Sequence, residues 1–262
     1  MRKNKQRILI IFDVDQTITK KDFFEYLMNA FLTNEESKYI ISQMPTYKNN
    51  YVPIQNIFYE TINKKGITIE KIKEILNTVE LNEGMKELFS FLEENKKHFE
   101  SIIISAGNSY NINYLLNKYK IHNLFKEIIS NKAYEKKNDL IFVEPCDLNH
   151  GCDKCNPCQC KTYELNKFLK KNPKENYDKI IFIGDGKGDC CLAAFLSEND
   201  WVLPRKNLVL YDSIIKGNLK NIIRSKVLPW ENAFEIIKFL QNTLQQLFYF
   251  IIYLKEIKKS LN

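Results

Sequence analysis

The chain has 262 residues, of which 44% are hydrophobic and 27% are charged, so its composition argues against wholesale disorder. The formal net charge is +7, but the lysines are scattered among Glu and Asn and form no nucleic-acid reader motif. The longest apolar run, 247–254, is much shorter than a membrane-spanning helix, and the run 8–12 behind the basic N-terminus is too short for a signal peptide. We therefore expect no membrane insertion, a cytoplasmic location and no nucleic-acid partner.

Short apolar runs alternate with helical patterns along the chain. Runs of this kind suit strands buried on both faces of a parallel sheet, and we predict strands at 7–12, 101–105 and 179–184, with weaker ones at 126–130 and 201–204. Helical spacing occurs at 85–95, 111–119, 162–171 and 190–197. This alternation predicts an α/β fold with a doubly wound parallel sheet.

The first two predicted strands are separated by almost ninety residues, too many for a single crossover helix. Four stretches in this gap are typical of helices: 19–33, 34–42, 53–63 and 68–77. We therefore predict a helical cap over 20–82, inserted after the first strand. The core would then consist of 1–19 and 83–230.

Two further features interrupt or follow the predicted core. Segments 132–136 and 140–144 flank a turn-prone Lys-Asn-Asp sequence and predict a β-hairpin. The hairpin and the cysteine-rich stretch behind it form an insertion at about 131–160. Apolar residues at helical spacing predict a C-terminal helical tail over 231–262: Ile236, Ile237, Leu240, Leu244, Leu247, Phe248 and Ile251.

Acidic residues follow two of the predicted strands. Asp13 and Asp15 come directly after the first strand, and Asp185 and Asp189 follow 179–184 in a glycine-rich string. Ligands of parallel sheets gather at the carboxyl ends of the strands, so we expect these carboxylates in one crevice. They would repel one another unless a cation neutralised them, and such hard oxygen ligands suit Mg²⁺. Each string taken alone is also compatible with a plain surface turn.

Two other positions fit a phosphate-binding pattern. The string Ser105-Ala106-Gly107 follows the second predicted strand, where a hydroxyl and the free N–H groups at a helix start can cradle a phosphate. Lys161 opens the helix behind the cysteines. Neither is specific alone, because serine is common at helix N-caps and most lysines are solvated.

Taken together and in this order, the four motifs resemble the haloacid dehalogenase superfamily of phosphotransferases, to about residue 230. Within it, the sequence is similar to the branch of phosphoethanolamine/phosphocholine phosphatases and their pyridoxal-phosphate-hydrolysing relatives. That branch carries a similar His-x-Cys-x-x-Cys followed by Cys-Lys, which corresponds here to 150–161, and a string similar to 184–191.

The resemblance implies a phosphatase that hydrolyses a small phosphorylated metabolite with the help of Mg²⁺. Asp13 would attack phosphorus and form an aspartyl-phosphate, and Asp15 would act as general acid and then as general base. Mg²⁺ would be held by Asp13, the backbone carbonyl of Asp15 and Asp185, with Asp189 as a ligand or just behind the ligands.

The resemblance also assigns substrate-binding roles. Ser105 and Lys161 would hold phosphoryl oxygens, beside Ala106 and Gly107, and Thr17 would orient the loop. The insert 20–82 would be a mobile cap that excludes water and selects the substrate.

The sequence departs from this branch at positions that bear on the substrate. Members that act on phosphocholine or phosphoethanolamine have an Asp after the serine of the second motif, where this chain has Ala106, and an acidic residue early in the cap, where it has Phe24. Leu192 replaces a usual proline. A cationic head group therefore loses its expected partners. Pyridoxal phosphate stays a candidate, because an aromatic cap can stack on its ring.

Five of the seven cysteines lie within 146–160, and the odd total does not indicate a disulfide framework. Soft ligands for a structural Zn²⁺ are abundant there: His150, Cys152, Cys155, Cys158 and Cys160. Cys152 and Cys155 have the C-x-x-C spacing of zinc sites. The short spacing from Cys155 to Cys158 and Cys160, however, does not match the geometry of an ordinary zinc knuckle. Two interpretations of these cysteines therefore stay open: a zinc site that rigidifies the loop, or reduced thiols without a metal. The alternative function is a non-enzymatic, zinc-stabilised binding or scaffold module.

Overall fold

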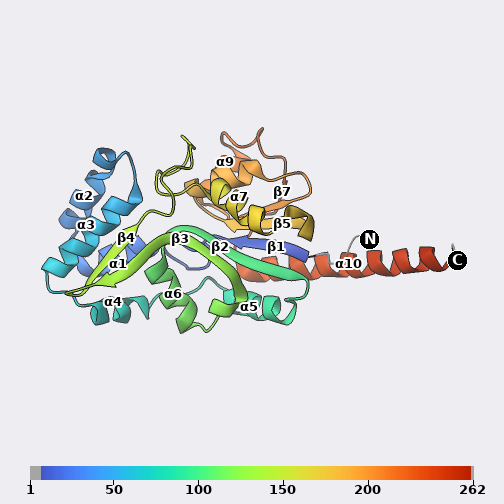
Figure 1. Cartoon of the computed structure of the whole chain (residues 1–262), viewed down its shortest axis with the longest axis horizontal. Helices are drawn as coiled ribbons and strands as arrows, with labels where there is room; N and C mark the ends of the chain where they lie inside the picture. The colour runs from blue at the N-terminus through green and yellow to red at the C-terminus, as the bar shows by residue number, and fades with distance from the viewer. Residues whose placement is uncertain (1–6, 261–262) are drawn as a thin grey trace.

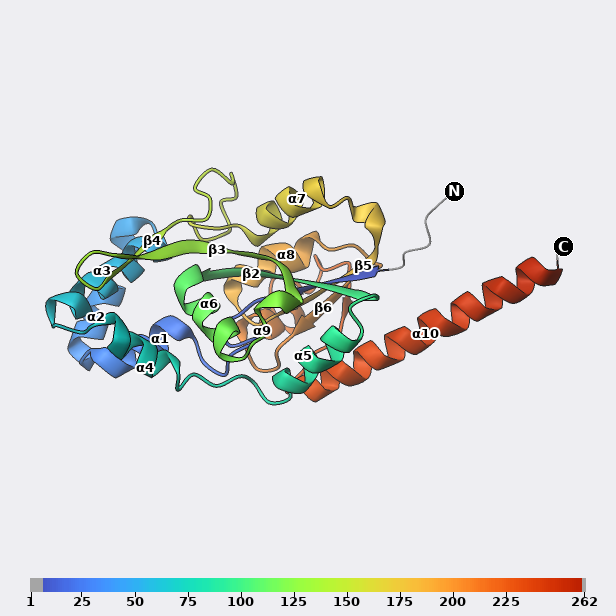
Figure 2. The same cartoon turned by 60° about the horizontal axis from the view of Figure 1, so that its bottom comes forward.

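The computed structural model of the protein describes residues 7–260, with side chains described over 7–246. A seven-stranded sheet in the order β4-β3-β2-β1-β5-β6-β7 lies at its centre (Figures 1 and 2). The strands are β1 (Arg7–Phe12), β2 (Phe99–Asn108), β3 (Phe125–Lys136), β4 (Leu140–Glu144), β5 (Tyr177–Gly184), β6 (Trp201–Pro204) and β7 (Lys226–Val227). Neighbouring strands are parallel except in the β3–β4 pair. The predicted α/β fold with a mostly parallel sheet is confirmed.

The sheet is covered on both faces, which explains the continuous apolar runs. Alternate residues of β1 enter different clusters: Ile8 and Ile10 pack on one side, and Leu9 and Ile11 on the other. The first side is covered by α5 (Met85–Glu94), α6 (Ser109–Lys118) and α10 (Ala233–Ser260). The second is covered by α7 (Lys161–Lys171), α8 (Cys190–Phe195) and α9 (Val209–Ile215). The helices predicted at 85–95, 111–119, 162–171 and 190–197 are confirmed, whereas α9 and the two-residue β7 were not predicted.

Four helices fill the long gap between β1 and α5, at one end of the sheet (Figure 1). They are α1 (Phe23–Phe31), α2 (Asn34–Ser42), α3 (Tyr51–Lys64) and α4 (Ile69–Leu76). Each begins with a capping side chain, and Thr33 forms a complete capping box with Glu36 at the start of α2. The chain enters and leaves this insert side by side, because Thr19 and Leu81 form an isolated β-bridge.

The hairpin brings the sheet edge to the insert. The predicted strand 126–130 and the first arm of the hairpin form one strand, β3. Its last residues pair antiparallel with β4: Lys132 lies opposite Glu144, and Lys136 lies opposite Leu140. Asn56 of α3 holds β4 through two hydrogen bonds: its amide nitrogen donates to the carbonyl oxygen of Val143 at 2.9 Å, and its oxygen accepts from the Val143 N–H at 2.8 Å.

The tail helix α10 has 28 residues and packs on α5 through its first turns, where Ile236 and Leu240 are fully buried. Its far end projects from the rest of the molecule (Figure 2). The predicted positions Leu247, Phe248 and Ile251 lie outside the described side chains. Among the described residues, no helix is both long and apolar enough to cross a membrane.

Candidate active site

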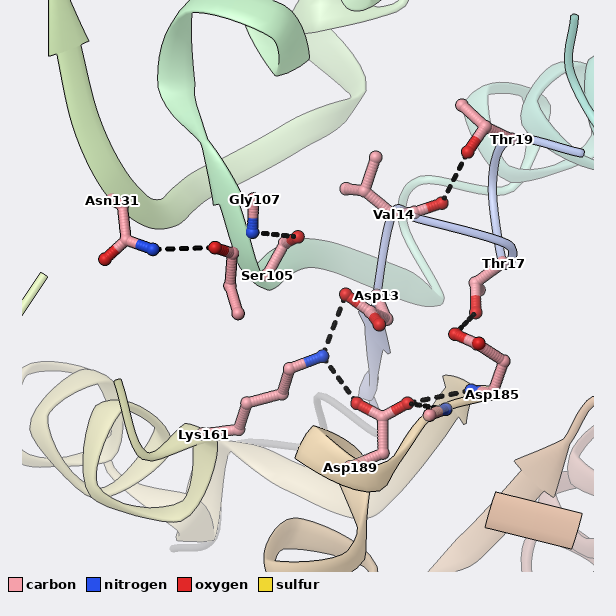
Figure 3. A network of polar contacts seen from close by, with 12 residues as sticks. Asp13, Val14, Thr17, Thr19, Ser105, Gly107, Asn131, Lys161, Asp185 and Asp189 are labelled. Carbon is pink, nitrogen blue, oxygen red and sulfur yellow. Dashed lines mark hydrogen bonds and ion pairs between the residues drawn. The ribbon is translucent and has the colours of Figure 1, made fainter. Parts of the chain in front are cut away.

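The predicted carboxylates meet where β1 and β5 end (Figure 3). Phe12 and Ile183 are register partners in these parallel strands, so Asp13 and Asp185 follow at the same edge of the sheet. Together with Asp189, they offer carboxylate oxygens that all lie within 4.8 Å of one another. All three residues are buried. The expectation that acidic groups from distant parts of the chain converge here agrees with this geometry.

Lys161 lies between two of these carboxylates. The residue is only 3% exposed, and its Nζ is 2.8 Å from Asp13 Oδ1 and 2.5 Å from Asp189 Oδ1. Burial alone would lower the pKa of Lys161, but the charges of Asp13 and Asp189 outweigh it and raise the pKa. The side chain is therefore a buried cation held between the two carboxylates.

Asp189 also organises the loop after β5. Its Oδ2 accepts hydrogen bonds from the backbone N–H groups of Asp185 at 2.8 Å and Gly186 at 2.9 Å. A Cβ on Gly184 would lie 2.5 Å from this same oxygen, so the close approach requires glycine. Both oxygens of Asp189 thus have partners within the protein, and this carboxylate holds both the loop after β5 and Lys161.

The loop after β1 is held by side chains from three other segments. Thr17 Oγ1 donates to Asp185 Oδ1 at 3.0 Å, and the Asn82 amide contacts the Thr17 carbonyl oxygen at 2.6 Å. Arg205 NH1 donates to the carbonyl oxygen of Gln16. Asn82 and Arg205 were not identified from the sequence, where neither belongs to a recognisable motif.

Asp15 lies beside the entry to the insert. Its Oδ1 accepts a hydrogen bond from the backbone N–H of Phe23 at 2.8 Å. Burial raises the pKa of Asp15 well above its usual value, and the charge of Asp22 raises it further. This environment favours a carboxylic acid that can donate a proton. Asp22, which caps α1 by accepting from the Glu25 N–H, was also missed, because a capping role gives no catalytic signature in the sequence.

The electrostatics of the site fit a divalent cation. Burial, with the charges of Asp13 and Asp189, raises the pKa of Asp185 to about 8. Burial raises the pKa of Asp13 to about 6, although Lys161 opposes the shift. The negative charge is therefore only partly neutralised by the lysine, and the hard oxygen donors are of the type that Mg²⁺ prefers.

Ser105 reaches the same place from the next strand. It is buried near the end of β2, and its Oγ accepts from the Gly107 N–H at 3.1 Å. A Cβ on Gly107 would lie 3.2 Å from both Ser105 Oγ and Asp15 Oδ2, so this strand end runs close against Asp15. Ala106 is half-buried, and its carbonyl oxygen accepts from the Asn131 amide at 2.6 Å.

A buried polar network joins the insert to the end of β2. The Asn108 amide donates to Gln55 Oε1 at 2.8 Å and to the Tyr59 hydroxyl at 3.2 Å, and that hydroxyl donates to Asn111 Oδ1 at 3.3 Å. Gln55 and Tyr59 belong to α3, and all four residues are buried. These contacts hold α3 of the insert against the end of β2 and were not predicted, since their partners are about fifty residues apart in the chain.

The cysteines form a separate group. Thiol sulfurs of four residues lie within 4.8 Å of one another: Cys152, Cys155, Cys160 and Cys191. Two predicted ligands are outside it: His150 Nε2 contacts the Asn156 carbonyl oxygen at 3.1 Å, and buried Cys158 lies 3.5 Å from the Asn131 amide. The ligand set predicted from the sequence is therefore not the set that the structure brings together. Cys191 was missed because it lies some thirty residues further along the chain.

Comparisons with known proteins agree with this fold. The family match and the curated relatives, together with the fold, show a phosphatase of the haloacid dehalogenase superfamily. Residues 8–244 match the model of the Putative Phosphatase family, and the chain belongs to that family.

Curated relatives cover nearly the whole chain. The pyridoxal phosphate phosphatase PHOSPHO2 of Bos taurus is 29% identical over 245 residues, which are 92% of this chain and 100% of the relative. The phosphoethanolamine/phosphocholine phosphatase of Gallus gallus is 26% identical, covering 92% of this chain and 90% of the relative. The inorganic pyrophosphatase 2 of Arabidopsis thaliana is 24% identical, covering 94% and 87%.

Solved structures share the fold. A phosphoserine phosphatase described as a phospho-aspartyl intermediate analogue has a TM-score of 0.56 and 17% identity, covering 90% of this chain and 99% of its own. Cytosolic 5′-nucleotidase IIIB bound to cytidine has a TM-score of 0.58 and 17% identity, covering 94% and 88%. The chain thus shares the fold of these enzymes.

Proposed function

We propose that the protein hydrolyses a small phosphomonoester with Mg²⁺ through an aspartyl-phosphate on Asp13. The observation that carries this proposal is the convergence of Asp13, Asp185 and Lys161 at one edge of the sheet, with Ser105 on the neighbouring strand. A nucleophile, a fixed cation and hydroxyl and N–H donors are the parts that phosphoryl transfer needs, because the reaction depends on positioning and charge stabilisation.

In the first half-reaction, a carboxylate oxygen of Asp13 attacks phosphorus and the bond from phosphorus to the leaving oxygen breaks. Asp15, held by the Phe23 N–H at 2.8 Å, donates its proton to that oxygen. Lys161 and Ser105 hold the phosphoryl oxygens on which charge builds up. In the second half-reaction, Asp15 takes a proton from water, which attacks phosphorus and releases phosphate and free Asp13.

Mg²⁺ would be held by Asp13, the backbone carbonyl of Asp15 and Asp185, and it would supply charge neutralisation for the phosphoryl group. Thr17 fixes the Asp185 carboxylate through its hydroxyl. Asp189 holds the loop and Lys161 in place, so we assign it a role behind the ligands. Asp185 and Asp13 are buried next to each other, so a bound cation favours their charged forms.

We propose pyridoxal phosphate as the substrate to test first. The relatives at about 29% identity carry this activity in their names, and this chain has Ala106 and Phe24 where a cationic head group would require acids. Phe24 packs edge-on against Phe58, with ring centroids 5.3 Å apart, within the aromatic interior of the insert. The insert 20–82 would act as the cap that excludes water. The seven free thiols are compatible with the reducing cytoplasm that we propose as the location.

The test is a phosphate-release assay with a panel of pyridoxal phosphate, phosphoethanolamine, phosphocholine, phosphoserine and pyrophosphate, with Mg²⁺ and with a chelator. We expect Mg²⁺-dependent turnover, with the highest kcat/KM for pyridoxal phosphate, and its loss in Asp13→Asn. Asp178→Asn, at the opposite end of β5 and exposed, is the matched control and should keep the activity. Wild-type turnover by Asp13→Asn would refute the mechanism, whereas another preferred substrate would refute only the substrate assignment.

A further inference from the structure

Four cysteine side chains converge from two distant parts of the chain. Cys152, Cys155 and Cys160 come from the loop between β4 and α7, and Cys191 comes from the first turn of α8. Cys191 Sγ lies 3.9 Å from both Cys152 Sγ and Cys160 Sγ. The other three cysteines of the chain do not belong to this group.

These distances match a tetrahedral metal site. Zn–S bonds of about 2.3 Å in a tetrahedron place neighbouring sulfurs roughly 3.8 Å apart. Sulfurs joined in a disulfide are only about 2.05 Å apart, and all seven cysteines are free here. A group of four thiols in which every pair lies within 4.8 Å therefore has the size of a metal cage.

Two local features can stabilise negative charge on these sulfurs. Cys160 is the N-cap of α7, where the positive end of the helix dipole stabilises negative charge. The Thr162 hydroxyl donates to Cys191 Sγ at 3.3 Å, and hydrogen bonds of this kind orient and tune metal-bound sulfur. The C-x-x-C spacing of Cys152 and Cys155 is the usual start of a structural zinc site.

We propose that Cys152, Cys155, Cys160 and Cys191 bind one structural Zn²⁺. Four protein ligands close the coordination sphere, so the ion has no open position for catalysis. Tetrahedral sulfur sites bind zinc or iron, and a single closed Cys₄ site in a hydrolase calls for a metal without redox chemistry, which is zinc.

The site would connect three parts of the molecule. Cys160 directly precedes Lys161, and Cys191 follows Asp189 by two residues, so the ion joins the two segments whose side chains meet at 2.5 Å in the active site. The same loop contacts the insert, because the Asn156 amide donates to the Asn49 carbonyl oxygen at 2.6 Å. The zinc would thereby position Lys161, a consequence that rests on the proposed function.

The direct test is to measure the metal content of the purified protein by elemental mass spectrometry. We expect one zinc per chain in the wild type and strongly reduced zinc in Cys191→Ser. Cys190→Ser, at the neighbouring position of the same helix, is the matched control and should retain full zinc, because its thiol contacts the Gly186 carbonyl oxygen instead. Absence of zinc, iron in its place, or equal zinc in the two variants would overturn the proposal.

A second measurement covers the case in which Cys191→Ser does not fold. Wild-type protein reconstituted with Co²⁺ should show the intense visible absorption of tetrahedral cobalt and sulfur-to-metal charge transfer. An octahedral spectrum without charge transfer would overturn the four-thiolate site. Both readouts are independent of any hydrolytic activity, so they stand even if the proposed reaction is wrong.

The link to Lys161 has its own readout. If the zinc positions this lysine, Cys191→His, which can still bind metal, should keep zinc and most of kcat/KM, whereas Cys191→Ser should lose both. If Cys191→Ser loses zinc but keeps kcat and KM unchanged, the zinc does not position Lys161, and its role is limited to the structure of the loop.

Discussion

Replacing Lys161 with methionine tests the electrostatic core of the site. The ammonium group lies 2.8 Å from Asp13 Oδ1, and unit charges at that distance attract by ~6 kcal/mol at an effective dielectric constant of ~20. Desolvation offsets part of this attraction, and breaking a buried pair by removing one partner costs about 3–5 kcal/mol. We expect the free energy of unfolding to fall by that amount at pH 8 and kcat to fall ~10²–10³-fold.

The loss of stability should depend on pH. The pKa of Asp13 is already raised to about 6 with Lys161 in place, and removing the cation raises it further. A carboxyl whose folded pKa lies above its unfolded value destabilises the fold increasingly as pH rises, so the deficit should be larger at pH 8 than at pH 5.

Urea unfolding of metal-free protein at both pH values measures this deficit, and steady-state phosphatase kinetics measure kcat. Lys170→Met is the matched control on the same helix: its side chain is exposed, so its loss should change stability by less than about 1 kcal/mol. A Lys161→Met variant as stable and as active as the control would refute the reasoning.

Three other variants test separate parts of the account. Asp15→Asn should lower kcat by ~10²–10⁴-fold, and more for alkyl phosphates than for aryl phosphates, because the better leaving group needs less protonation; equal losses for both would contradict the general-acid role. Gly184→Ala should lower the thermal midpoint and the activity, because the added Cβ would lie 2.5 Å from Asp189 Oδ2, whereas Gly188→Ala, with open space at that position, should match the wild type. For Glu100, burial raises the pKa, but hydrogen bonds from Lys126 and Tyr177 outweigh it and lower the pKa. Glu100→Gln should therefore lose about 1.5–3 kcal/mol of unfolding free energy at pH 7. This loss should shrink as pH falls through the folded pKa, and a pH-independent loss would show that the charge is not responsible.

The sheet could be predicted because its strands are buried on both faces. Each of β1, β2 and β5 contains a short, continuously apolar run, and the long gap after β1 left room only for an insert of several helices. α9 and β7 escaped prediction because a seven-residue helix and a two-residue strand leave too short a pattern. The division of β3 into two predicted strands failed for a different reason: one continuous strand pairs first with β2 and then with β4.

The residues that converge at the candidate site could be predicted because each one follows a strand or begins a helix within a recognisable motif. Groups that act through tertiary contacts carried no such signal. Asn82 holds the Thr17 loop across 65 residues of sequence, and Arg205 reaches Gln16 across 189. Cys191, the fourth thiol of the cysteine group, also gave no signal in the sequence, because it meets Cys160 only when α7 and α8 pack together.

The most direct test of the central claim is to trap the phosphorylated enzyme. Asp15→Asn, mixed with substrate and Mg²⁺ and quenched in acid within a turnover, should carry a phosphoryl group that peptide mass spectrometry locates on Asp13. The Asp13→Asn variant, treated in the same way, should carry no phosphoryl group. A phosphoryl group on another residue, or turnover without any phosphorylated enzyme, would contradict nucleophilic attack by Asp13.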